Sequence, residues 1–245
     1  MGTALITGAG GGIGQALCQA FQRAGYDVIG LDRPGVPVPV GCRGIVADLE
    51  VFCRDGAYRQ RIEEEVRSHL SHASLKVLIN NAAMQVIKPT EALTPKDWHS
   101  TLDVNLVAPC LLAQVCLPSL EAAQGSIINI ASIHATLTKP GFVCYATSKA
   151  AMVGLTRSLA VDLGSRVRVN AIAPAAVSTP MLVEGFAEQP EQLQQLAQMH
   201  PQGRIASPDE VAQAALFLAS AQASFICGAV LGVDGGIGGR LHDPI

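Results

Sequence analysis

The chain has 245 residues with 17 basic and 20 acidic side chains, a net charge of −3, and 49% hydrophobic against 15% charged residues. This apolar composition excludes a disordered chain, and the lack of a basic run together with 4% aromatic residues argues against nucleic acid as a partner. The length suits one α/β domain spanning residues 1–245, with no linker-like stretch inside it.

The cysteines and histidines show no spacing typical of a metal site or of a disulfide framework. The seven cysteines therefore predict free thiols in a reducing cytoplasm, without a bound metal. The chain opens on a strand-like segment rather than a signal peptide, and its most apolar region, residues 106–117, is too short to span a bilayer. We expect a cytoplasmic protein without a membrane partner.

Short apolar runs alternate with longer helical segments along the whole chain, which is the pattern of βαβ units. The predicted strands are residues 4–7, 27–31, 44–47, 76–80, 126–130, 167–172 and 229–233, and the predicted helices are residues 13–24, 58–70, 102–117, 145–163 and 208–220. The strands are nearly continuous in Val, Ile and Leu, as expected for a parallel sheet that is covered on both faces. The sequence predicts a Rossmann-type doubly wound α/β fold, with seven parallel strands between two layers of helices.

A glycine-rich turn follows the first predicted strand. Gly8, Gly12 and Gly14 belong to a cluster that leads directly into the first helix, where free N–H groups favour a pyrophosphate. Asp32 ends the second strand about twenty residues on, where a carboxylate accepts ribose hydroxyls and repels a 2′-phosphate. Arg33 beside it is the one feature that suits a 2′-phosphate, and no Lys or Arg in the glycine turn supports it. We predict NAD as the cofactor rather than NADP.

A tyrosine and a lysine lie four residues apart at the start of the helix at 145–163. This spacing places Tyr145 and Lys149 on one helix face. A nearby ammonium group in a dehydrated cleft favours the phenolate and so lowers the pKa of a tyrosine. The pair therefore predicts a general acid/base for carbonyl reduction or alcohol oxidation.

Six motifs follow one another along the chain in a characteristic order. They are Thr7-Gly8-x-x-x-Gly12-Ile13-Gly14, Asn80-Asn81-Ala82-Ala83, Asn105, Ser132, Tyr145-x-x-x-Lys149 and the segment 174–179. Over essentially its whole length the chain resembles the single-domain short-chain dehydrogenases/reductases. The resemblance implies an NAD(P)-dependent oxidoreductase that acts on CH–OH groups of small alcohols or ketones. Two positions depart from the family pattern, because Ala83 and Ala175 stand where the family usually has glycine.

The resemblance also implies roles for individual residues. Tyr145 would be the general acid/base, and Lys149 would lower its pKa and hold the nicotinamide ribose. Ser132 would bind the substrate oxygen, and Asn105 would anchor a water that links Lys149 to solvent. The implied cofactor residues are Gly8, Gly12, Ile13 and Gly14 at the diphosphate, Asp32 and Arg33 at the adenosine ribose, Asp48 and Leu49 at the adenine, Asn81 near the ribose, Val177 and Thr179 at the nicotinamide amide, and Val104, Tyr145 and Lys149 in the same site.

Residues 178–204 are predicted to form a substrate lid. The segment begins apolar and becomes rich in glutamine, which predicts an amphipathic helix over the cleft. It has no Lys or Arg before Arg204, which argues against a phosphate close to the reacting carbon. The predicted substrate pocket consists of Ser132, His134, Cys144, Tyr145 and Met181, with His134 as a candidate donor to a second substrate oxygen.

Two alternative functions stay open. A 3-oxoacyl-carrier-protein reductase would use Arg166 to dock an acidic carrier, although Asp32 argues against the NADPH that such reductases prefer. A non-catalytic dinucleotide sensor would be expected to lack Tyr145 or Lys149, and both are present. The helices at 102–117 and 145–163 carry more small and apolar residues than one sheet face requires, so we expect a homo-oligomer, either a tetramer or a dimer.

Overall fold

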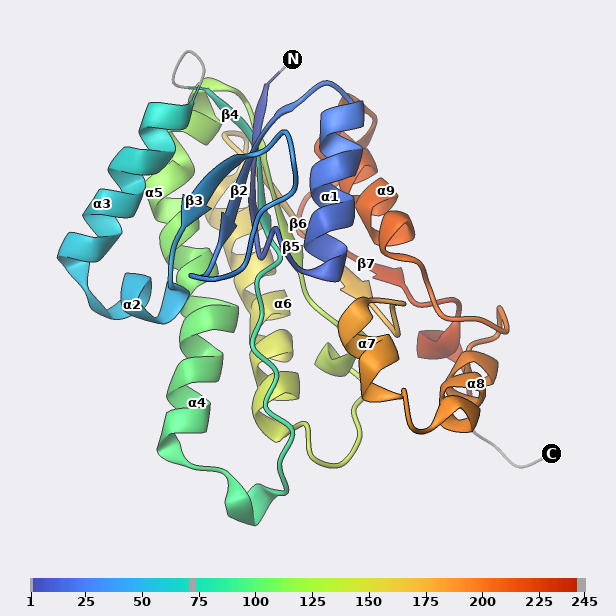
Figure 1. The fold of residues 1–245 in the computed structure, drawn as a ribbon. Helices are drawn as coiled ribbons and strands as arrows, with labels where there is room; N and C mark the ends of the chain where they lie inside the picture. The colour runs from blue at the N-terminus through green and yellow to red at the C-terminus, as the bar shows by residue number, and fades with distance from the viewer. Residues whose placement is uncertain (1, 71–73, 242–245) are drawn as a thin grey trace.

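A parallel sheet of seven strands runs through the middle of the computed structural model, which describes residues 2–70 and 74–241 (Figure 1). The strand order is β3-β2-β1-β4-β5-β6-β7, and every pairing is parallel. The strands are β1 (Thr3–Thr7), β2 (Asp27–Asp32), β3 (Arg43–Val46), β4 (Leu75–Asn80), β5 (Ser126–Ile130), β6 (Arg168–Pro174) and β7 (Val230–Val233). The predicted doubly wound α/β fold and all seven predicted strands are confirmed.

Helices cover both faces of this sheet (Figure 1). On one face, α1 (Gly12–Arg23) packs beside α9 (Pro208–Ala219), and both contribute to a buried cluster with the sheet. The helices whose buried residues join the cluster on the other face are α2 (Leu49–Arg54), α3 (Gly56–His69), α5 (Ala108–Ala122) and α6 (Val143–Leu163). These two clusters form most of the core, and they explain why the central strands are apolar on both sides.

The predicted helix at 102–117 is part of a longer helical stretch with an irregular middle. Helix α4 (Pro95–Leu102) begins with a capping box between Thr94 and Asp97, and α5 ends at Ala122. Between them the segment Asp103–Val107 forms a π-helical turn. The sequence did not reveal α4, because the capping box at Thr94 lies several residues before the apolar run that predicted a helix at 102–117. A π turn often occurs at a functional site, and this one contains Asn105.

The stretch Pro95–Ala122 is also long and apolar enough to cross a membrane by length and composition alone, with 44% of its most apolar window buried. Helix α5 places Leu112, Cys116 and Leu120 in the core beneath the sheet. Packing against the sheet therefore accounts for the buried part of this window, while the helical stretch is longer than the run 106–117 that the sequence marked as too short to span a bilayer.

The predicted single lid helix is two short helices. They are α7 (Pro180–Gly185) and α8 (Pro190–Met199), and each begins with a proline in its first turn. Pro190 lacks a backbone N–H and so starts a helix more readily than it continues one. The remaining helical turns are the 3₁₀ segments Thr90–Ala92, Ile133–Ala135, Ala221–Ala223 and Ile237–Gly239.

Candidate active site

The chain passes the carboxyl edge of the sheet at several points that carry predicted site residues. β1 ends at Thr7 and leads into the glycine-rich loop, β4 ends at Asn80, and β6 ends at Pro174. β5 ends at Ile130, two residues before Ser132. Because these strands pair in parallel, all four ends lie at one edge, where ligands of doubly wound sheets bind.

Tyr145 and Lys149 lie one turn apart on α6, as predicted. The Lys149 Nζ is 5.6 Å from the centroid of the Tyr145 ring and donates a hydrogen bond of 2.7 Å to the carbonyl of Ile130. Lys149 is only 2% exposed, and this burial lowers its pKa to about 8. Burial also raises the pKa of Tyr145, and a hydrogen bond with Ser132 opposes that rise. Burial therefore has a larger effect on the pKa of Tyr145 than the lowering that was expected from Lys149. The Lys149 ammonium is held at a backbone carbonyl, and burial disfavours the charged form of Lys149.

Ser132 and His134 lie in the turn that follows β5. The Ser132 hydroxyl accepts a hydrogen bond of 3.1 Å from the His134 amide and so begins the 3₁₀ turn. The His134 ring stacks on Phe142 with centroids 4.5 Å apart, and it meets the Tyr145 ring edge-on at 5.7 Å. Burial lowers the pKa of His134, and Lys139 adds to the effect. The His134 imidazole, whose charged form is disfavoured by burial, therefore borders Tyr145, and its place in a substrate pocket stays a prediction.

Asn105 fixes the π turn to two neighbouring elements. Its Oδ1 accepts the Met84 amide at 2.7 Å, while Nδ2 donates to the Met84 carbonyl at 2.8 Å and to the Ser148 hydroxyl at 2.9 Å. Ser148 in turn donates to the Tyr145 carbonyl. Asn105 is fully buried and both of its N–H groups are occupied, so its side chain joins the π turn to the helix that carries Tyr145. The predicted water contact stays a prediction.

The glycine-rich loop provides a narrow backbone cradle. A Cβ on Gly14 would overlap the Gly8 carbonyl oxygen, and a Cβ on Gly12 would lie 2.8 Å from Thr179 Cβ. Gly8 has a φ of +63°, which favours glycine. The N-cap of α1 is Gly11, so no side chain caps the first amides of this helix. The uncapped N–H groups and the absence of side chains fit a pyrophosphate.

Asp32 lies where an adenosine ribose would be expected. Its Oδ2 accepts the Gly10 amide at 2.8 Å, and its Oδ1 accepts the Arg33 amide at 2.8 Å. The carboxylate is therefore anchored beside the glycine-rich loop. The Arg33 side chain is exposed.

Asn81 holds the glycine-rich loop from the next strand. Its Nδ2 donates to the carbonyls of Thr7 and Gly8 at 2.9 and 3.1 Å, and its own amide donates to the Thr7 hydroxyl. The sequence had suggested only ribose contact for Asn81. Among the described non-glycine residues only Gln124 has a positive φ, so the two alanines that replace family glycines, Ala83 and Ala175, cause no backbone strain.

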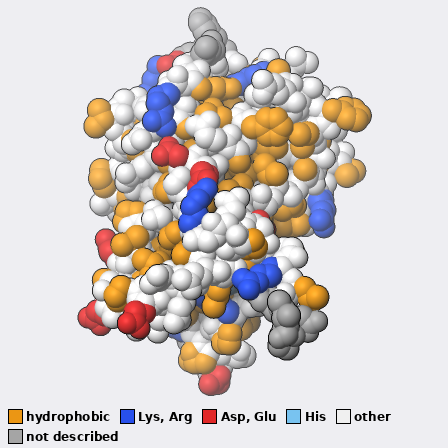
Figure 2. All heavy atoms as spheres, turned by 90° about the vertical axis from the view of Figure 1, so that its right-hand side faces the viewer, with side chains coloured by type: hydrophobic (Ala, Val, Ile, Leu, Met, Phe, Trp, Pro, Cys, Tyr) orange, Lys and Arg blue, Asp and Glu red, His pale blue; other side chains and the backbone are white. Residues whose placement is uncertain are grey.

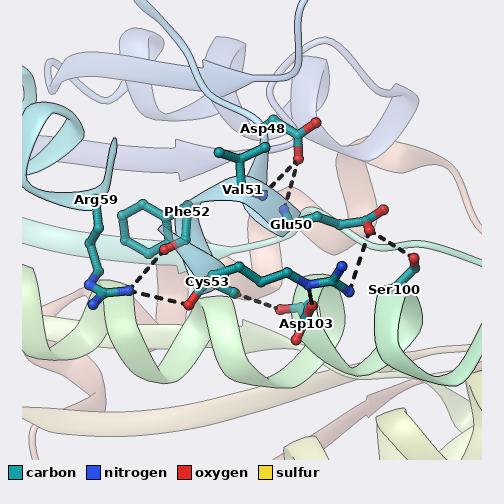
Figure 3. Close-up of polar contacts among 9 residues, drawn as sticks. Asp48, Glu50, Val51, Phe52, Cys53, Arg59, Ser100 and Asp103 are labelled. Carbon is teal, nitrogen blue, oxygen red and sulfur yellow. Dashed lines mark hydrogen bonds and ion pairs between the residues drawn. The ribbon is translucent and has the colours of Figure 1, made fainter. Parts of the chain in front are cut away.

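Asp48 and Leu49 begin α2 beside the same edge (Figure 3). The Asp48 side chain accepts the amides of Glu50 and Val51 at 2.8 and 3.3 Å, so it acts as the N-cap. Figure 3 also shows Glu50 pointing to Ser100, whose hydroxyl donates at 2.7 Å. These contacts tie α2 to α4 and hold the predicted adenine-binding residues in place.

Val177 and Thr179 lie over the glycine-rich loop after β6. Val177 forms a parallel bridge with Ala206, and Thr179 caps α7 through its hydroxyl. The contact of Thr179 with Gly12 brings the predicted nicotinamide and diphosphate residues together. The remaining predicted cofactor residues, Ile13 and Val104, are both half-buried.

Two predicted pocket residues differ in their exposure to solvent. Cys144 is fully buried and close enough to Asp97 and Lys88 for both to influence its pKa, which burial raises. It therefore does not form an accessible pocket wall, which corrects the prediction. Met181 on α7 is 76% exposed, as a lid residue can be.

Sequence reasoning missed three groups that support the site. Thr7 accepts the amides of Asn81 and Ala82 at 3.0 Å, Ser148 bridges Asn105 and Tyr145, and the Ile130 carbonyl receives Lys149. Thr7 was visible as the polar residue that ends an apolar strand, whereas Ser148 stands between Thr147 and Lys149 and carried no such signal. A backbone carbonyl carries no sequence signal.

The chain is similar to known proteins over nearly its whole length. A family model described as "Enoyl-(Acyl carrier protein) reductase" matches residues 8–238. The 3-oxoacyl-[acyl-carrier-protein] reductase of Thermotoga maritima is 34% identical over 95% of this chain and 96% of its own, and the D-threitol dehydrogenase of Mycolicibacterium smegmatis is 36% identical over 95% and 91%. The ligand-free aldohexose dehydrogenase of Thermoplasma acidophilum superposes with a TM-score of 0.91 at 30% identity, covering 100% of this chain and 96% of that one. Together with the arrangement of Ser132, Tyr145 and Lys149, these similarities show that the chain belongs to the short-chain dehydrogenases/reductases, nicotinamide dinucleotide-dependent oxidoreductases that act on alcohol and ketone groups.

Proposed function

We propose that this chain is an NAD-dependent oxidoreductase that interconverts a secondary alcohol and a ketone, with Tyr145 as the general acid/base. The observation that carries the proposal is the joining of Ser132, Tyr145 and the buried Lys149 at the carboxyl end of β5. The bound nicotinamide ring would supply the hydride acceptor or donor. Every other part of the chemistry belongs to side chains of this chain.

During alcohol oxidation Tyr145 takes the hydroxyl proton, and during ketone reduction it returns one to the carbonyl oxygen. Ser132 shares a hydrogen bond with the Tyr145 hydroxyl, so the two groups address the same substrate oxygen. Lys149 is held by Ile130 close to the Tyr145 ring, and the hydrogen bond from Ser132 favours the Tyr145 phenolate. Asn105 and Ser148 keep this face of α6 in position.

Replacing Tyr145 by Phe tests the reaction. The change removes the proton-transferring hydroxyl and little else, so kcat should fall by at least about 10²-fold. The dissociation constant for NADH, measured by the fluorescence of the reduced nicotinamide, should stay within about threefold. Retained turnover in this variant would end the mechanism, whatever the substrate.

The preference for NAD over NADP rests on the surroundings of Asp32. Val36 Cγ1 and the Pro37 carbonyl lie 2.5 Å from where a Cβ on Gly10 would stand. The space beside the Asp32 carboxylate is therefore bordered by an apolar side chain and a carbonyl oxygen, which disfavour a phosphate dianion. Comparison of kcat/KM for the two dinucleotides decides the point, and a higher value with NADP would refute it.

The relatives act on different substrates, including a carrier-bound oxoacyl group, a tetritol and aldohexoses by their names. The carrier-protein alternative needs a free cation to dock an acidic partner. Arg166 instead forms an ion pair of 2.6 Å with Glu121, so this structure favours a free small molecule. A screen of polyols, sugars, hydroxy acids and steroids with NAD would identify the substrate class, and turnover of a 3-oxoacyl carrier protein alone would support the alternative.

A homo-oligomer in a reducing cytoplasm remains our proposed working form. All seven cysteines are free thiols. Figure 2 faces the side with α7, α8 and α9 and shows hydrophobic side chains gathered on it; Phe217, Phe225 and Leu231 are 40%, 102% and 36% exposed. Val161 on α6, one of the helices predicted to pair, is 84% exposed. Sedimentation should detect a dimer or tetramer, and a monomer alone would contradict this part of the proposal.

A further inference from the structure

His134 is a residue beside the candidate site to which the proposed reaction gives no role. It lies in the 3₁₀ turn after β5, two residues beyond Ser132, and its amide donates to the Ser132 hydroxyl at 3.1 Å. This bond uses the Ser132 oxygen as an acceptor, so the Ser132 O–H is left to donate to the reacting oxygen of a substrate. One turn of the chain therefore positions both the Ser132 hydroxyl and the His134 imidazole.

The orientation of the imidazole follows from the aromatic rings around it. The His134 ring stacks on Phe142, with the two planes 9° apart. The Tyr145 ring stands at 76° to the imidazole and at 74° to the phenyl ring, with centroids 5.7 and 6.2 Å away. A ring above the imidazole would lie much farther from Phe142, so Tyr145 lies beside the stack. An edge of the imidazole therefore faces Tyr145.

One nitrogen of the imidazole is free to meet a substrate. Nδ1 lies 3.0 Å from the Thr138 hydroxyl, and this contact restrains the ring on that side. Nε2 has no hydrogen-bond partner in the described part of the chain, and it is not one of the buried polar atoms that lack a partner. Nε2 is therefore open to solvent, on a half-buried ring beside Tyr145.

The surroundings of the imidazole suit a neutral oxygen better than a charged one. Burial and the nearby Lys139 lower the pKa of His134, which favours the uncharged form of the ring. The Lys139 ammonium lies over the Phe142 ring, 4.9 Å from its centroid. An uncharged imidazole forms a hydrogen bond with a hydroxyl group, whereas a carboxylate or a phosphate is bound more strongly by a charged donor. The ligand group at Nε2 is therefore a hydroxyl.

We propose that His134 selects substrates with two adjacent oxygens, namely vicinal diols in oxidation and α-hydroxy ketones in reduction. This inference rests on the proposed function, in which Ser132 and Tyr145 bind the oxygen that reacts. The imidazole edge directly adjoins the Tyr145 ring, so an oxygen bound at Nε2 lies close to the first one, as on neighbouring carbons. The stack on Phe142 and the contact with Thr138 hold the ring in place before a substrate binds, which limits the entropy lost on binding.

Two alcohols that differ by one hydroxyl group test this selection. With its preferred dinucleotide the wild-type protein should oxidise 2,3-butanediol with a kcat/KM about tenfold above that for 2-butanol, each as a mixture of stereoisomers. Acetoin and 2-butanone form the matching pair for reduction, and acetoin should be preferred by a similar factor. Equal values within either pair, or a preference for lactate over 2,3-butanediol, would overturn the inference and leave the proposed oxidoreductase standing. Failure to oxidise any secondary alcohol would overturn the proposed function, and the inference with it.

Variants connect the preference to the imidazole. His134→Phe keeps a ring against Phe142 and removes both ring nitrogens, so the ratio of kcat/KM between diol and alcohol should fall to about one. Thr138→Val leaves the imidazole and removes its Nδ1 partner, so the ratio should fall by about threefold. The matched control, His99→Ala on the exposed surface of α4, should keep the wild-type ratio. NADH fluorescence checks that each variant binds dinucleotide. An unchanged ratio in His134→Phe, or in Thr138→Val if the first variant does not bind NADH, would overturn the assignment.

Discussion

Lys149 is a candidate site residue whose burial lowers the stability of the folded protein. Its side chain is 2% exposed, and its amine donates one hydrogen bond, to Ile130. The pKa falls from 10.5 to about 8 because burial disfavours the ammonium. Such a shift corresponds to about 3 kcal/mol of lost stability when the group is charged. A perturbed, buried lysine beside a tyrosine is typical of a catalytic site rather than of a core.

The stability that is lost by burying the charged Lys149 amine depends on pH. Between about pH 8 and pH 10.5 the unfolded chain binds the Lys149 proton and the folded chain does not, so the free energy of unfolding rises with pH in this window. Below pH 8 the folded state carries the whole penalty. Lys149→Met removes the titration, so its stability relative to wild type should decrease by about 2.5 kcal/mol from pH 7 to pH 10.

Urea unfolding at the two pH values measures this difference. The variant loses the hydrogen bond to Ile130 at every pH, which leaves the pH dependence unaffected. Lys96→Met on the exposed surface of α4 is the matched control and should show a constant difference from wild type. A constant difference for Lys149→Met as well would show that the buried amine does not titrate in this range.

At the scale of elements, the glycine-rich loop and α1 depend on close backbone contact. Gly14 lies in the first turn of α1, against Gly8 and Ala9. A Cβ at Gly14 would lie 2.8 Å from the Gly8 carbonyl carbon and 2.9 Å from Ala9 Cα. Backbone atoms cannot move aside as a flexible side chain can, so the loop conformation requires glycine there.

Gly14→Ala should therefore lower the free energy of unfolding by about 1–3 kcal/mol. Gly11→Ala is the matched control in the same loop, because its Cβ would be 3.4 Å from the Gly8 oxygen and its φ is −72°. That variant should stay within about 0.5 kcal/mol of wild type. Thermal unfolding without cofactor measures both, and equal stabilities would show that α1 can shift away from the loop.

Across the whole molecule, Arg168 joins the sheet to the end of α9. It begins β6, and its guanidinium donates to the carbonyls of Leu218, Ala219, Ser220 and Ala223 at 2.9 to 3.4 Å. The carbonyls of Leu218 and Ala219 lie at the helix end, which leaves them without intrahelical donors, while those of Ser220 and Ala223 also accept the amides of Ala223 and Ile226. A cation at this helix end also interacts favourably with the helix dipole. One side chain thus fixes the helix layer to the strand that leads to the lid.

Arg168→Met should destabilise the protein by about 2–4 kcal/mol, since it removes the hydrogen bonds to all four carbonyls and leaves those of Leu218 and Ala219 without this donor. The matched control is Arg166→Met two residues earlier, which removes an exposed ion pair with Glu121 and should cost less than about 1 kcal/mol. Chemical denaturation gives both values. Similar losses for the two variants would mean that water replaces the arginine at the end of α9.

The sequence alone determined the sheet, the glycine-rich loop and the residue types of the site. Strands buried on both faces are continuous in apolar residues, and the glycines, Asp32, Ser132, Tyr145 and Lys149 each follow such a strand or share a helix face. These are local signals, readable because strand and helix periods differ.

Only the tertiary structure decided contacts between segments far apart in the chain. It placed Asn105 in a π turn against Ser148, buried Cys144 near α4, and formed the two helices α7 and α8 where the sequence had predicted one. It also made burial, rather than Lys149, the main influence on the pKa of Tyr145. A pKa depends on what surrounds a group in space, and those neighbours are set by packing rather than by any short stretch of sequence.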